Sequence, residues 1–431
     1  MSIDRLYSLF LDSNGVATDT RKVSKGEIFF ALKGPNFNGN SFAVNAIEEH
    51  GAIASIVDEK INHPNCIYVD DVLSTLQNLS KHHRLQFKIP ILALTGSNGK
   101  TTTKELIKAV LDTTFQTHAT VGNLNNQIGI PLTLLSMKKG TEIGVIEMGA
   151  NHKGEIASYC EYTMPTHGLI TNIGLAHLEG FGGPEGVMLG KSELYKYLTA
   201  NSGTLFINAD DEVLVDLAKN YPNIQTFGAK ENTTIQGNIQ QSTTGFLEFD
   251  WSCKSEVSVR QSTHLVGNYN FSNAMYAILI GIYFNIEVQK IEDAIKSYIP
   301  ENNRSQSKRI GKNTFILDAY NANPSSMKEA LISLSNQIAS EKWAVLGGMK
   351  EMGEFEEDVH IEIADLAKNL QLNTILIGPE FLKASSVYSF KHFMTSDEAG
   401  SWLKNNLPSD ACILLKGSRG TALEKILPYL D

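Results

Sequence analysis

One stretch of the sequence has the residue types of a phosphate-binding loop. The segment ILALTGSNGKTTTKELI, residues 91–107, places Gly99, Lys100 and Thr101 in a row between an apolar run and a polar one. Phosphate-binding loops usually read G-x-x-x-x-G-K-[ST], and Leu94 stands where the first glycine is expected. The segment is therefore a variant of the usual loop.

The context of this loop favours nucleotide binding over a plain strand-to-helix turn. Backbone N–H groups of a glycine-rich turn that leads into a helix form an anion cradle. Lys100 can then reach the terminal phosphates, and the Thr101 hydroxyl can bind magnesium. An apolar run precedes the loop, and the apolar positions after it keep helical spacing: Leu106, Ile107, Val110 and Leu111.

Two further runs end in polar residues. Glu147 closes the apolar run in VIEMGAN, and its carboxylate can serve a magnesium–phosphate pair at the same sheet edge. The alternative is that Glu147 is a solvated acid at the end of a strand. Because the phosphate-binding loop is present, a role as a metal ligand is favoured. In TNIGLAHLEGFGG, Asn172 and His177 follow another run, and local evidence does not separate a functional His177 from a structural one.

Lys191 lies in the middle of an apolar stripe. The positions around it in EGVMLGKSELYKYL are Val187, Met188, Leu194, Tyr195 and Leu198. A buried ammonium group must be paired or chemically altered. The alternative is a buried stem with the charged head in water, and periodicity does not choose between the two.

The last third of the chain holds two more polar strand ends. In ILDAYNANPSSM an apolar run ends at Asp318, and Ser325 is placed to cap the helix that follows. A capped turn explains this pattern, but its density of polar groups also suits a binding site. LLKGSRGTALE repeats the pattern, with Lys416 and Arg419 beside small residues that let a backbone approach an anion.

The composition of the chain argues against nucleic acid and membrane as binding partners. The 431 residues are 42% hydrophobic and 19% charged, with a net charge of −10, which argues against non-specific nucleic-acid binding. No run reaches the roughly 18 apolar residues of a membrane span. The four cysteines lie far apart, so neither a disulfide framework nor a zinc site is expected. Because residues 1–10 lack an export signal, we expect a cytoplasmic protein.

The order of apolar runs predicts an α/β protein of three domains. A small α/β unit is expected at 1–85, a central doubly wound parallel-sheet domain with the phosphate-binding loop at 86–300, and a second Rossmann-like α/β domain at 301–431. The run IPENNRSQS, residues 299–307, is the best linker. AMYAILIGIYF, residues 274–284, is expected to be a buried helix.

The motifs together resemble those of the Mur ligases of peptidoglycan synthesis. TGSNGKTTTKE looks like the shortened loop of that family, which also lacks the first glycine. GNLNNQIGIPLTLL, YNANPSSM and LKGSRG favour the members that join D-alanyl-D-alanine to UDP-N-acetylmuramoyl-tripeptide. The resemblance covers nearly the whole chain and implies a role in cell-wall synthesis, and thereby in cell shape and division.

The resemblance implies an ATP- and Mg²⁺-dependent, ADP-forming reaction. ATP would phosphorylate the terminal carboxylate of the UDP-linked tripeptide, and the amine of the dipeptide would attack the acyl phosphate. Domains 1–85, 86–300 and 301–431 would bind UDP, ATP and the dipeptide, respectively. We expect a monomer with two magnesium sites, one of them through a carbamylated Lys191.

The resemblance also implies a role for each motif residue. The catalytic and metal-binding residues would be Lys100, Thr101, Glu147, His177 and Lys191. The nucleotide would contact Gly96, Asn98, Gly99, Lys100, Thr101, Thr102, Asn270, Asn273, Arg304 and Asp318. The other substrates would contact Thr20, Arg21, Asn123, Asn125, Asn126, Tyr320, Asn321, Asn323, Lys416, Ser418 and Arg419. Three positions depart from the family pattern, namely Asn40 and Tyr269, where His is common, and Gly348, where Asp is usual.

Two other functions fit parts of the sequence. A folylpolyglutamate synthase shares the loop and the acyl-phosphate chemistry, but it should lack the uridine-binding segment TDTRKVSKGEIFFALKG and the YNANP motif. A non-catalytic nucleotide-binding scaffold would be expected to lose Lys100, Glu147 or Lys191, and all three are present. A GTPase would carry an N-K-x-D-type motif, which the chain lacks.

Overall fold

The chain forms two compact units. The computed structural model describes residues 1–242, 244–253, 256–301 and 303–430. One unit comprises residues 1–94, 115–150 and 154–168, and the other comprises residues 95–114, 151–153 and 169–431. The first of the boundaries along the chain falls after Leu94, directly before the phosphate-binding loop.

The first unit begins with a four-stranded parallel sheet in the order β1-β2-β5-β6. Its strands are β1 (Val16–Ala17), β2 (Ile28–Phe30), β5 (Ala54–Val57) and β6 (Cys66–Tyr68), and β3 (Lys33–Gly34) pairs with β4 (Phe37–Asn38). Its helices are α1 (Ile3–Leu11), η1 (Thr20–Lys22), η2 (Gly39–Phe42), α2 (Ala43–Glu48) and α3 (Val72–Arg84).

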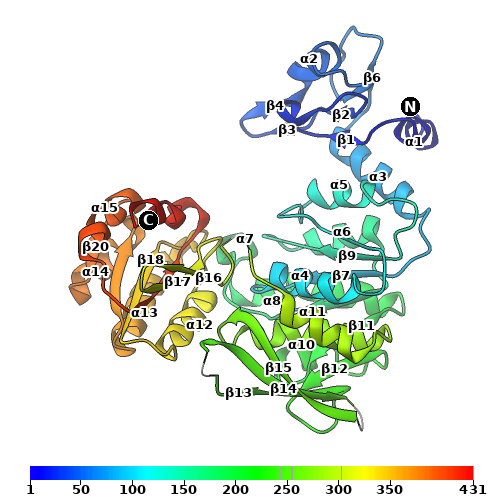
Figure 1. Ribbon diagram of the computed structural model, residues 1–431. Coiled ribbons are helices and arrows are strands. Elements are labelled where there is room, and N and C mark those ends of the chain that lie inside the picture. Colours follow the sequence, from blue (N-terminus) through cyan, green and yellow to red (C-terminus); the bar gives the residue numbers. More distant parts are fainter. Residues whose placement is uncertain (243, 254–255, 302, 431) are drawn as a thin grey trace. The chain divides into compact units, whose positions relative to one another are not determined.

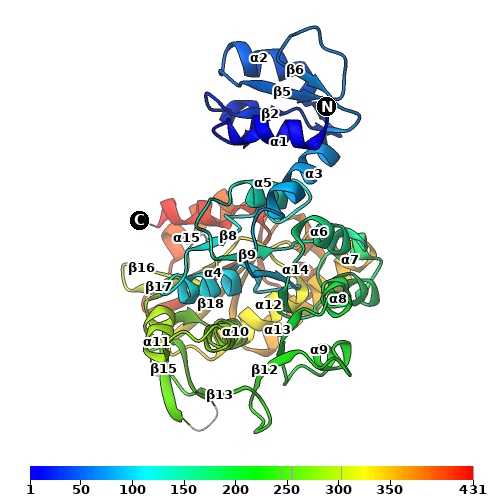
Figure 2. The same cartoon turned by 90° about the vertical axis from the view of Figure 1, so that its right-hand side faces the viewer.

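Successive side chains of β2 pack into the hydrophobic cores on opposite faces of this sheet. Ile28 and Phe30 pack with Leu6 of α1 and Leu76 of α3, whereas Phe29 packs with Ala43 and its neighbours in α2. Successive side chains of a strand point to opposite faces, so a continuous apolar strand needs cover on both sides. Figure 2 shows α2 above the sheet and α1 below it.

The remainder of the first unit is a parallel layer in the order β8-β9-β7. It contains β7 (Ile91–Thr95, whose last residue belongs to the second unit), β8 (Thr117–Ala119), α5 (Gly129–Leu135), β9 (Ile143–Glu147) and α6 (Glu155–Thr163). In the register of β7 and β9, Glu147 lies opposite Leu94, two residues before Gly96. The sheet therefore fixes Glu147 against the strand that leads into the loop.

The second unit begins with parallel strands and their helices. These are α4 (Lys100–Leu111), β10 (His167–Ile170, which begins in the first unit), α7 (Leu178–Phe181), α8 (Pro184–Ala200), β11 (Thr204–Asn208), α9 (Glu212–Leu217), β12 (Ile224–Gly228) and β13 (Ile235–Gln240). Strands β11, β12 and β13 pair in parallel. Helices α10 (Asn270–Tyr283) and α11 (Val288–Ser297) follow the next two strands.

Those two strands are antiparallel, which the sequence analysis missed. β14 (Phe246–Cys253) pairs antiparallel with both β13 and β15 (Glu256–Val266) (Figure 1). The doubly wound parallel sheet was therefore an incomplete prediction for this part of the chain. The signal was present, because Leu247, Phe249 and Trp251 are buried and alternate with more exposed residues.

The last part of the second unit is a six-stranded sheet in the order β16-β17-β21-β18-β19-β20. Its strands are β16 (Gln306–Ile310), β17 (Asn313–Asp318), β18 (Glu341–Gly347), β19 (Asn373–Ile377), β20 (Lys391–Phe393) and β21 (Ala411–Lys416). Its helices are α12 (Pro324–Ser335), η3 (Gly353–Phe355), α13 (Glu356–Asn369), η4 (Pro379–Phe381), α14 (Leu382–Tyr388), α15 (Ser396–Asn406), η5 (Arg419–Thr421) and η6 (Leu423–Tyr429). All pairs are parallel except β16 with β17.

The secondary structure agrees with most of the predicted runs. The helix predicted at 274–284 corresponds to α10, which begins four residues earlier and ends one residue earlier and has buried residues on all sides. All four apolar positions predicted for the helix after the loop are buried in α4. The linker was predicted two residues too long, because Gln306 and Ser307 belong to β16. No helix among the described residues is long and apolar enough to cross a membrane.

Two leucines in α8 provide a matched test of the packing. Leu194 is fully buried, whereas Leu189 is 40% exposed. We expect Leu194→Ala to lower the free energy of unfolding by about 2–5 kcal/mol because it leaves a cavity. Leu189→Ala should cost less than about 1 kcal/mol. Urea unfolding of both variants measures this, and equal midpoints would contradict the burial of Leu194.

Candidate active site

The phosphate-binding loop is held by its own lysine. The Lys100 ammonium donates to the carbonyl oxygen of Gly96 at 2.7 Å and to that of Ser97 at 3.2 Å. Gly96 and Gly99 have φ values of +144° and +77°, which L side chains rarely adopt. The two glycines let the loop turn back over itself, and Lys100 lies across the turn.

The segment after β10 supports the loop from a second side. Asn172 Oδ1 accepts from the Asn98 N–H at 3.0 Å, and the Thr171 hydroxyl donates to the Asn98 carbonyl at 2.6 Å. The Ser97 N–H donates to the Asn172 carbonyl, also at 3.0 Å. A Cβ on Gly96 would lie 1.9 Å from the Thr171 hydroxyl oxygen, so only glycine fits there.

Helix α10 supports the start of α4. Asn273 Oδ1 accepts from the Thr103 hydroxyl at 2.9 Å, and the Asn273 amide donates to Asn270 Oδ1 at 2.8 Å. Both asparagines are buried. A Cβ on Gly99 would come within 2.5 Å of Asn273 Oδ1. The two predicted nucleotide contacts therefore lie against the loop and its helix, where they hold both in place.

The start of α12 also contacts the loop. The Asn323 amide donates to Asn98 Oδ1 at 2.7 Å, while Asn323 Oδ1 caps α12 by accepting from the Ser326 N–H at 2.9 Å. The Ser325 hydroxyl accepts from the Leu175 N–H, also at 2.9 Å. A capped turn is thus present, but Ser325 was the wrong residue for the cap, because Asn323 caps α12 while Ser325 contacts Leu175. Asn323 also binds the loop.

Glu147 lies at the end of β9 in the first unit and is buried. Asn125 donates its side-chain amide to Glu147 Oε1 at 2.8 Å, and the Asn125 carbonyl accepts from the Gly149 N–H at 2.7 Å. Asn126 Oδ1 accepts from the Gly129 N–H at the start of α5 at 2.9 Å. Asn123 is exposed. Of these three predicted substrate contacts, Asn125 is the one that orients Glu147.

His177 pairs with a residue that the sequence analysis did not identify. Its Nδ1 contacts Oε2 of Glu351, and both residues have a left-handed backbone, with φ values of +54° and +62°. Burial lowers the pKa of His177, and the positive charges of Lys100 and Lys191 lower it further, against an opposing effect of Glu351. His177 is therefore favoured in its neutral form at pH 7.

Lys191 is buried in α8, with 1% of its surface exposed. Its ammonium nitrogen lies 4.9 Å from the centroid of the Phe181 ring. This rules out a side chain whose head reaches water, which was one of the two alternatives for a lysine on an apolar stripe. The charged group is held inside the protein.

The carboxyl ends of β17 and β21 bring the last predicted residues together. Asp318 and Lys416 are register partners, and the buried Lys416 ammonium donates to Asp318 Oδ2 at 2.6 Å. The guanidinium carbons of Arg304 and Arg419 lie 3.6 Å and 5.7 Å from the centroid of the Tyr320 ring. Ser418 is buried and its hydroxyl contacts that of Thr421, whereas Asn321 is exposed.

The predicted uridine-binding residues lie in the first unit. Thr20 and Arg21 form η1, and the exposed Arg21 guanidinium binds Asp19 with two hydrogen bonds of 2.9 and 2.8 Å. These bonds lower the pKa of Asp19 to about 2. Asn40 is buried and donates to Asp58 Oδ1 at 2.7 Å. Asn40 thus fixes a carboxylate that also pairs with Lys33.

The two other departures from the family pattern have structural explanations. The Tyr269 hydroxyl lies 2.8 Å from the Ser305 hydroxyl and so connects the start of α10 to the end of the linker. A Cβ on Gly348 would lie 2.2 Å from Oε2 of Glu380, whose carboxylate pairs with Lys350. A side chain at position 348 would therefore displace Glu380.

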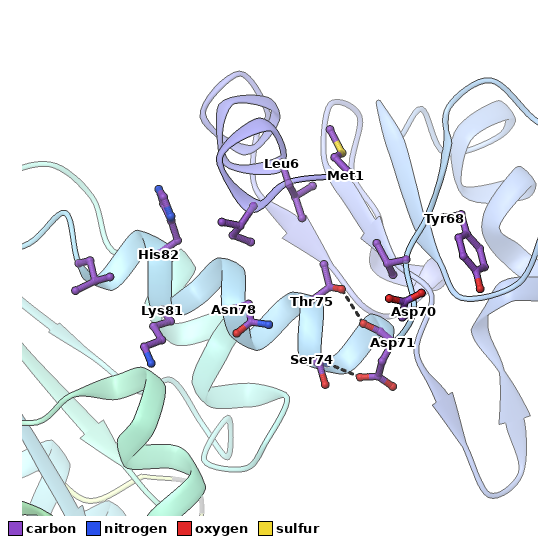
Figure 3. Close-up of a pocket in the computed structure, with 13 residues that line it drawn as sticks. Met1, Leu6, Tyr68, Asp70, Asp71, Ser74, Thr75, Asn78, Lys81 and His82 are labelled. Atoms are coloured by element: carbon purple, nitrogen blue, oxygen red, sulfur yellow. Dashed lines mark hydrogen bonds between the residues drawn. The ribbon is translucent and has the colours of Figure 1, made fainter.

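A pocket of about 850 Å³ lies elsewhere in the first unit. Residues of α1, β6 and α3 line it, among them Leu6, Tyr68, Asp70 and Lys81 (Figure 3). Asp71 at its edge caps α3 by accepting from the Ser74 N–H at 2.6 Å. None of the lining residues belongs to the predicted site.

Three domain families match consecutive parts of the chain. They are the Mur ligase family catalytic domain at 12–92, the Mur ligase middle domain at 94–281 and the Mur ligase glutamate ligase domain at 303–419. The UDP-N-acetylmuramoyl-tripeptide–D-alanyl-D-alanine ligase of Bacillus subtilis is 34% identical over 97% of this chain and 93% of that protein. The chain belongs to the Mur ligase family. The Escherichia coli ligase of the same name is 32% identical, over 97% of this Mur ligase and 94% of its relative.

Solved structures of Mur ligases have the same fold. MurF from Acinetobacter baumannii matches with a TM-score of 0.89 and 28% identity, over 100% of this chain and 98% of that one. MurF from Thermotoga maritima, in complex with ADP, matches with a TM-score of 0.86 and 26% identity, over 98% and 97% of the two chains. The resemblance predicted from the motifs is confirmed, as is the three-domain α/β fold.

Sequence reasoning missed two residues that contact the candidate site of this Mur ligase. Thr171 and Glu351 have no motif spacing of their own, since each acts through a partner far away in the chain. Hydrogen bonds between residues so distant in sequence leave no local pattern. Asp19 is a different case: it lies inside the TDTR segment, two residues before its partner Arg21, and was not assigned a contact.

Glu351 should control the protonation of His177. The negative charge of Glu351 raises the pKa of His177, whereas burial and the charges of Lys100 and Lys191 lower it. Because glutamine has no charge, we expect the pKa of His177 to fall further in Glu351→Gln. Histidine NMR titrations of the wild type and the variant measure this. Glu354→Gln, an exposed change in η3, is the control and should leave the titration unchanged. An equal or higher pKa in Glu351→Gln would exclude the pairing.

Proposed function

We propose that this Mur ligase uses ATP to join D-alanyl-D-alanine to UDP-N-acetylmuramoyl-tripeptide, giving UDP-N-acetylmuramoyl-pentapeptide, ADP and phosphate. The observation that carries the proposal is the full-length similarity to ligases of this name, at 34% identity in the relative from Bacillus subtilis. The loop around Lys100, between a strand and a helix, supplies the chemistry that such a reaction needs.

The reaction proceeds in two steps. The γ-phosphoryl group of ATP moves to the terminal carboxylate of the tripeptide and gives an acyl phosphate and ADP. The free amine of the dipeptide then attacks the acyl carbon, and the tetrahedral intermediate releases phosphate and a proton. Lys100 and the N–H groups of the loop bind the phosphates and stabilise the charge that develops on them. His177, which the charge of Lys100 helps to keep neutral by lowering its pKa, belongs to the same region.

The residues also fit magnesium. Among the residues that the structure describes, no group of three or more His, Cys, Asp or Glu side chains forms a metal site. Magnesium usually takes one or two carboxylates together with substrate phosphates and waters. A hydroxyl from Thr101 and a carboxylate from Glu147 have the chemistry that this requirement asks for, and we assign His177 to the same ion. The bound ion would polarise the phosphoryl oxygens.

We propose further that Lys191 is carbamylated. Lys191 and Lys100 both act on the pKa of His177 as positive charges, so three cationic or titratable groups share one region. A second ammonium buried there is unfavourable, and reaction of its neutral amine with CO₂ converts it into a carboxylate and releases a proton. The carbamate would be the ligand for a second magnesium ion.

The domain roles follow the three matched families. We assign UDP binding to 1–85 with Thr20 and Arg21, ATP binding to 86–300, and dipeptide binding to 301–431 with Tyr320 and Arg419. The matches at 12–92, 94–281 and 303–419 support these bounds. The other residues predicted from the resemblance to contact the nucleotide or the substrates are proposed in the same roles. A monomer in the cytoplasm stays our prediction.

Two alternatives have less support. A folylpolyglutamate synthase from Thermotoga maritima matches with a TM-score of 0.59 and 12% identity, which indicates a common fold alone. A scaffold without activity would have no need to keep Lys100, Glu147 and Lys191 together with the substrate motifs. Neither alternative accounts for YNANP and TDTR in one chain.

Product formation tests the proposed function directly. With ATP, Mg²⁺ and UDP-N-acetylmuramoyl-tripeptide, we expect phosphate release to depend on D-alanyl-D-alanine and mass spectrometry to detect the pentapeptide. Both the lysine and the diaminopimelate tripeptide are offered, because the third residue is not part of the proposal. If neither tripeptide gives dipeptide-dependent release, the substrate assignment is wrong.

Lys191 has a matched control in the same helix, since Lys196 of α8 is exposed. With ¹³C-bicarbonate, we expect a carbamate ¹³C signal that disappears in Lys191→Ala and persists in Lys196→Ala. Ligase activity should fall by at least about 100-fold in Lys191→Ala, as expected when a group that stabilises transition-state charge is removed. A carbamate signal that survives in Lys191→Ala would exclude the modification at this site.

A further inference from the structure

One hydrophobic core joins the N-terminal sheet to the part of the first unit that holds Glu147. Leu76 of α3 belongs to the same core as Ile28 of β2 and Leu135 of α5. Helix α5 follows Asn125, whose side-chain amide donates to Glu147 Oε1 at 2.8 Å. A continuous set of contacts therefore leads from the proposed uridine-binding sheet, through α3, to the proposed metal ligand.

The last residue of α3 is a buried arginine that contacts two other segments of the first unit. The Arg84 guanidinium donates to the carbonyl oxygens of Thr163 at 3.1 Å and Met164 at 3.4 Å, where α6 ends. It also donates to the carbonyl oxygens of Phe87 and Ile89, in the segment that leads into β7. A cation is favourable at the C-terminal end of a helix, where carbonyl groups lack partners within the helix. Carbonyl groups from two segments therefore orient this guanidinium group.

The residue before Arg84 connects α3 to α1 and α5. His83 is buried, with Nε2 3.1 Å from the Met137 carbonyl oxygen just after α5 and Nδ1 3.0 Å from the Tyr7 hydroxyl in α1. Burial lowers the pKa of His83, which favours the neutral ring. Because a carbonyl oxygen only accepts, Nε2 carries the hydrogen and Nδ1 accepts from Tyr7. One tautomer of His83 thus satisfies both partners.

The hydrogen bonds of Tyr7, His83 and Arg84, which we call the α3 junction, restrict rotation more than apolar contacts do. Burying a guanidinium group costs desolvation, and replacing buried charges by well-packed apolar side chains is often neutral or stabilising. Apolar surfaces can slide past one another, whereas a hydrogen bond weakens steeply as its angle departs from linear. The junction therefore fixes the orientation of the N-terminal sheet relative to α5 and α6.

We propose that Arg84 and His83 are positioning residues that keep the uridine-binding sheet in a fixed orientation to Glu147, so that binding of the UDP end places the tripeptide carboxylate for reaction. This inference rests on the proposed function. The UDP end takes no part in the chemistry, so its binding energy speeds the reaction only when it is used to orient the reacting group. A flexible junction would let UDP bind without placing the carboxylate.

The kinetic test compares Arg84→Met and Arg84→Lys with the control Arg5→Met. Arg5 is exposed in α1, so the control removes the same kind of side chain from the surface of the same unit. Calorimetry measures the affinities for UDP and for ATP. Pentapeptide formation is measured at saturating ATP, dipeptide and UDP-N-acetylmuramoyl-tripeptide.

We expect Arg84→Met to lower kcat by about 10- to 100-fold, because a displacement of about 1 Å can cost that much. Its affinities for UDP and ATP should equal those of the wild type, since neither binding site is changed. Arg84→Lys keeps the charge but loses the planar fork, so kcat should recover in part. A loss of folded protein would instead lower the number of binding sites for UDP and ATP together, which separates positioning from stability.

A distance measurement tests the junction without catalysis. Spin labels are attached through Glu49→Cys, after α2, and Glu161→Cys, in α6, both at exposed positions. The half-buried Cys66 and Cys253 are replaced by serine, so that the labels react with the new cysteines. We expect a narrow distribution of label distances when the junction is intact and a broader one in the Arg84→Met background.

Two results would overturn the proposal. One is an Arg84→Met enzyme with the kcat of the wild type, and the other is a label distribution no broader than that of Arg5→Met. Should Arg84→Met fail to fold, Tyr7→Phe removes a single hydroxyl from the junction, and the same two criteria decide. A wild-type enzyme that forms no pentapeptide contradicts the proposed function, whereas an active one whose Arg84→Met variant is unchanged contradicts the junction alone.

Discussion

The active site depends on how the phosphate-binding loop is held in a left-handed turn. Gly96 and Gly99 supply the positive φ values, but glycine alone leaves a loop with many conformations. Asn172, Thr171 and Asn273 restrict it: two bind the Asn98 backbone, and the third lies against Gly99. Because these partners lie on a strand end and on a packed helix, the loop takes its shape from rigid elements. A pre-shaped loop has less conformational entropy to lose on binding phosphate.

Buried charge is the second constraint on this fold. Lys191 and Lys416 are both about 1% exposed, and their ammonium groups lie in different surroundings. Lys416 is neutralised by Asp318, its register partner in the sheet. Lys191 lies against the Phe181 ring in a region that already holds Lys100 and His177. The cost of a buried ammonium explains why Lys416 lies against a carboxylate, and it is the reason that we propose the conversion of Lys191 into a carbamate.

The sequence predicted the elements that carry the site more fully than the contacts between them. The loop, its strand and its helix, and the polar ends after Glu147 and Asp318 could be read from local spacing. The antiparallel strands β14 and β15 could also have been found, from the alternation around Phe249. The Asn98–Asn323 and His177–Glu351 contacts join residues 225 and 174 positions apart, and no local pattern encodes a partner at that distance. Family resemblance supplied roles for Asn98, Asn323 and His177, but it did not supply Glu351.

The departures from the family pattern show how neighbouring residues accommodate a change of side chain. Tyr269 carries a hydroxyl that reaches Ser305, and the residue directly before Ser305 is Arg304, which is stacked on Tyr320. A residue at the start of α10 thus influences the position of a cation at the edge of another sheet. A histidine at position 269 would present its ring nitrogens closer to the backbone than the tyrosine hydroxyl, so it would need a different partner. Tyr269 is half-buried and its hydroxyl has Ser305 as its hydrogen-bond partner, so a change at one of the two residues affects the other.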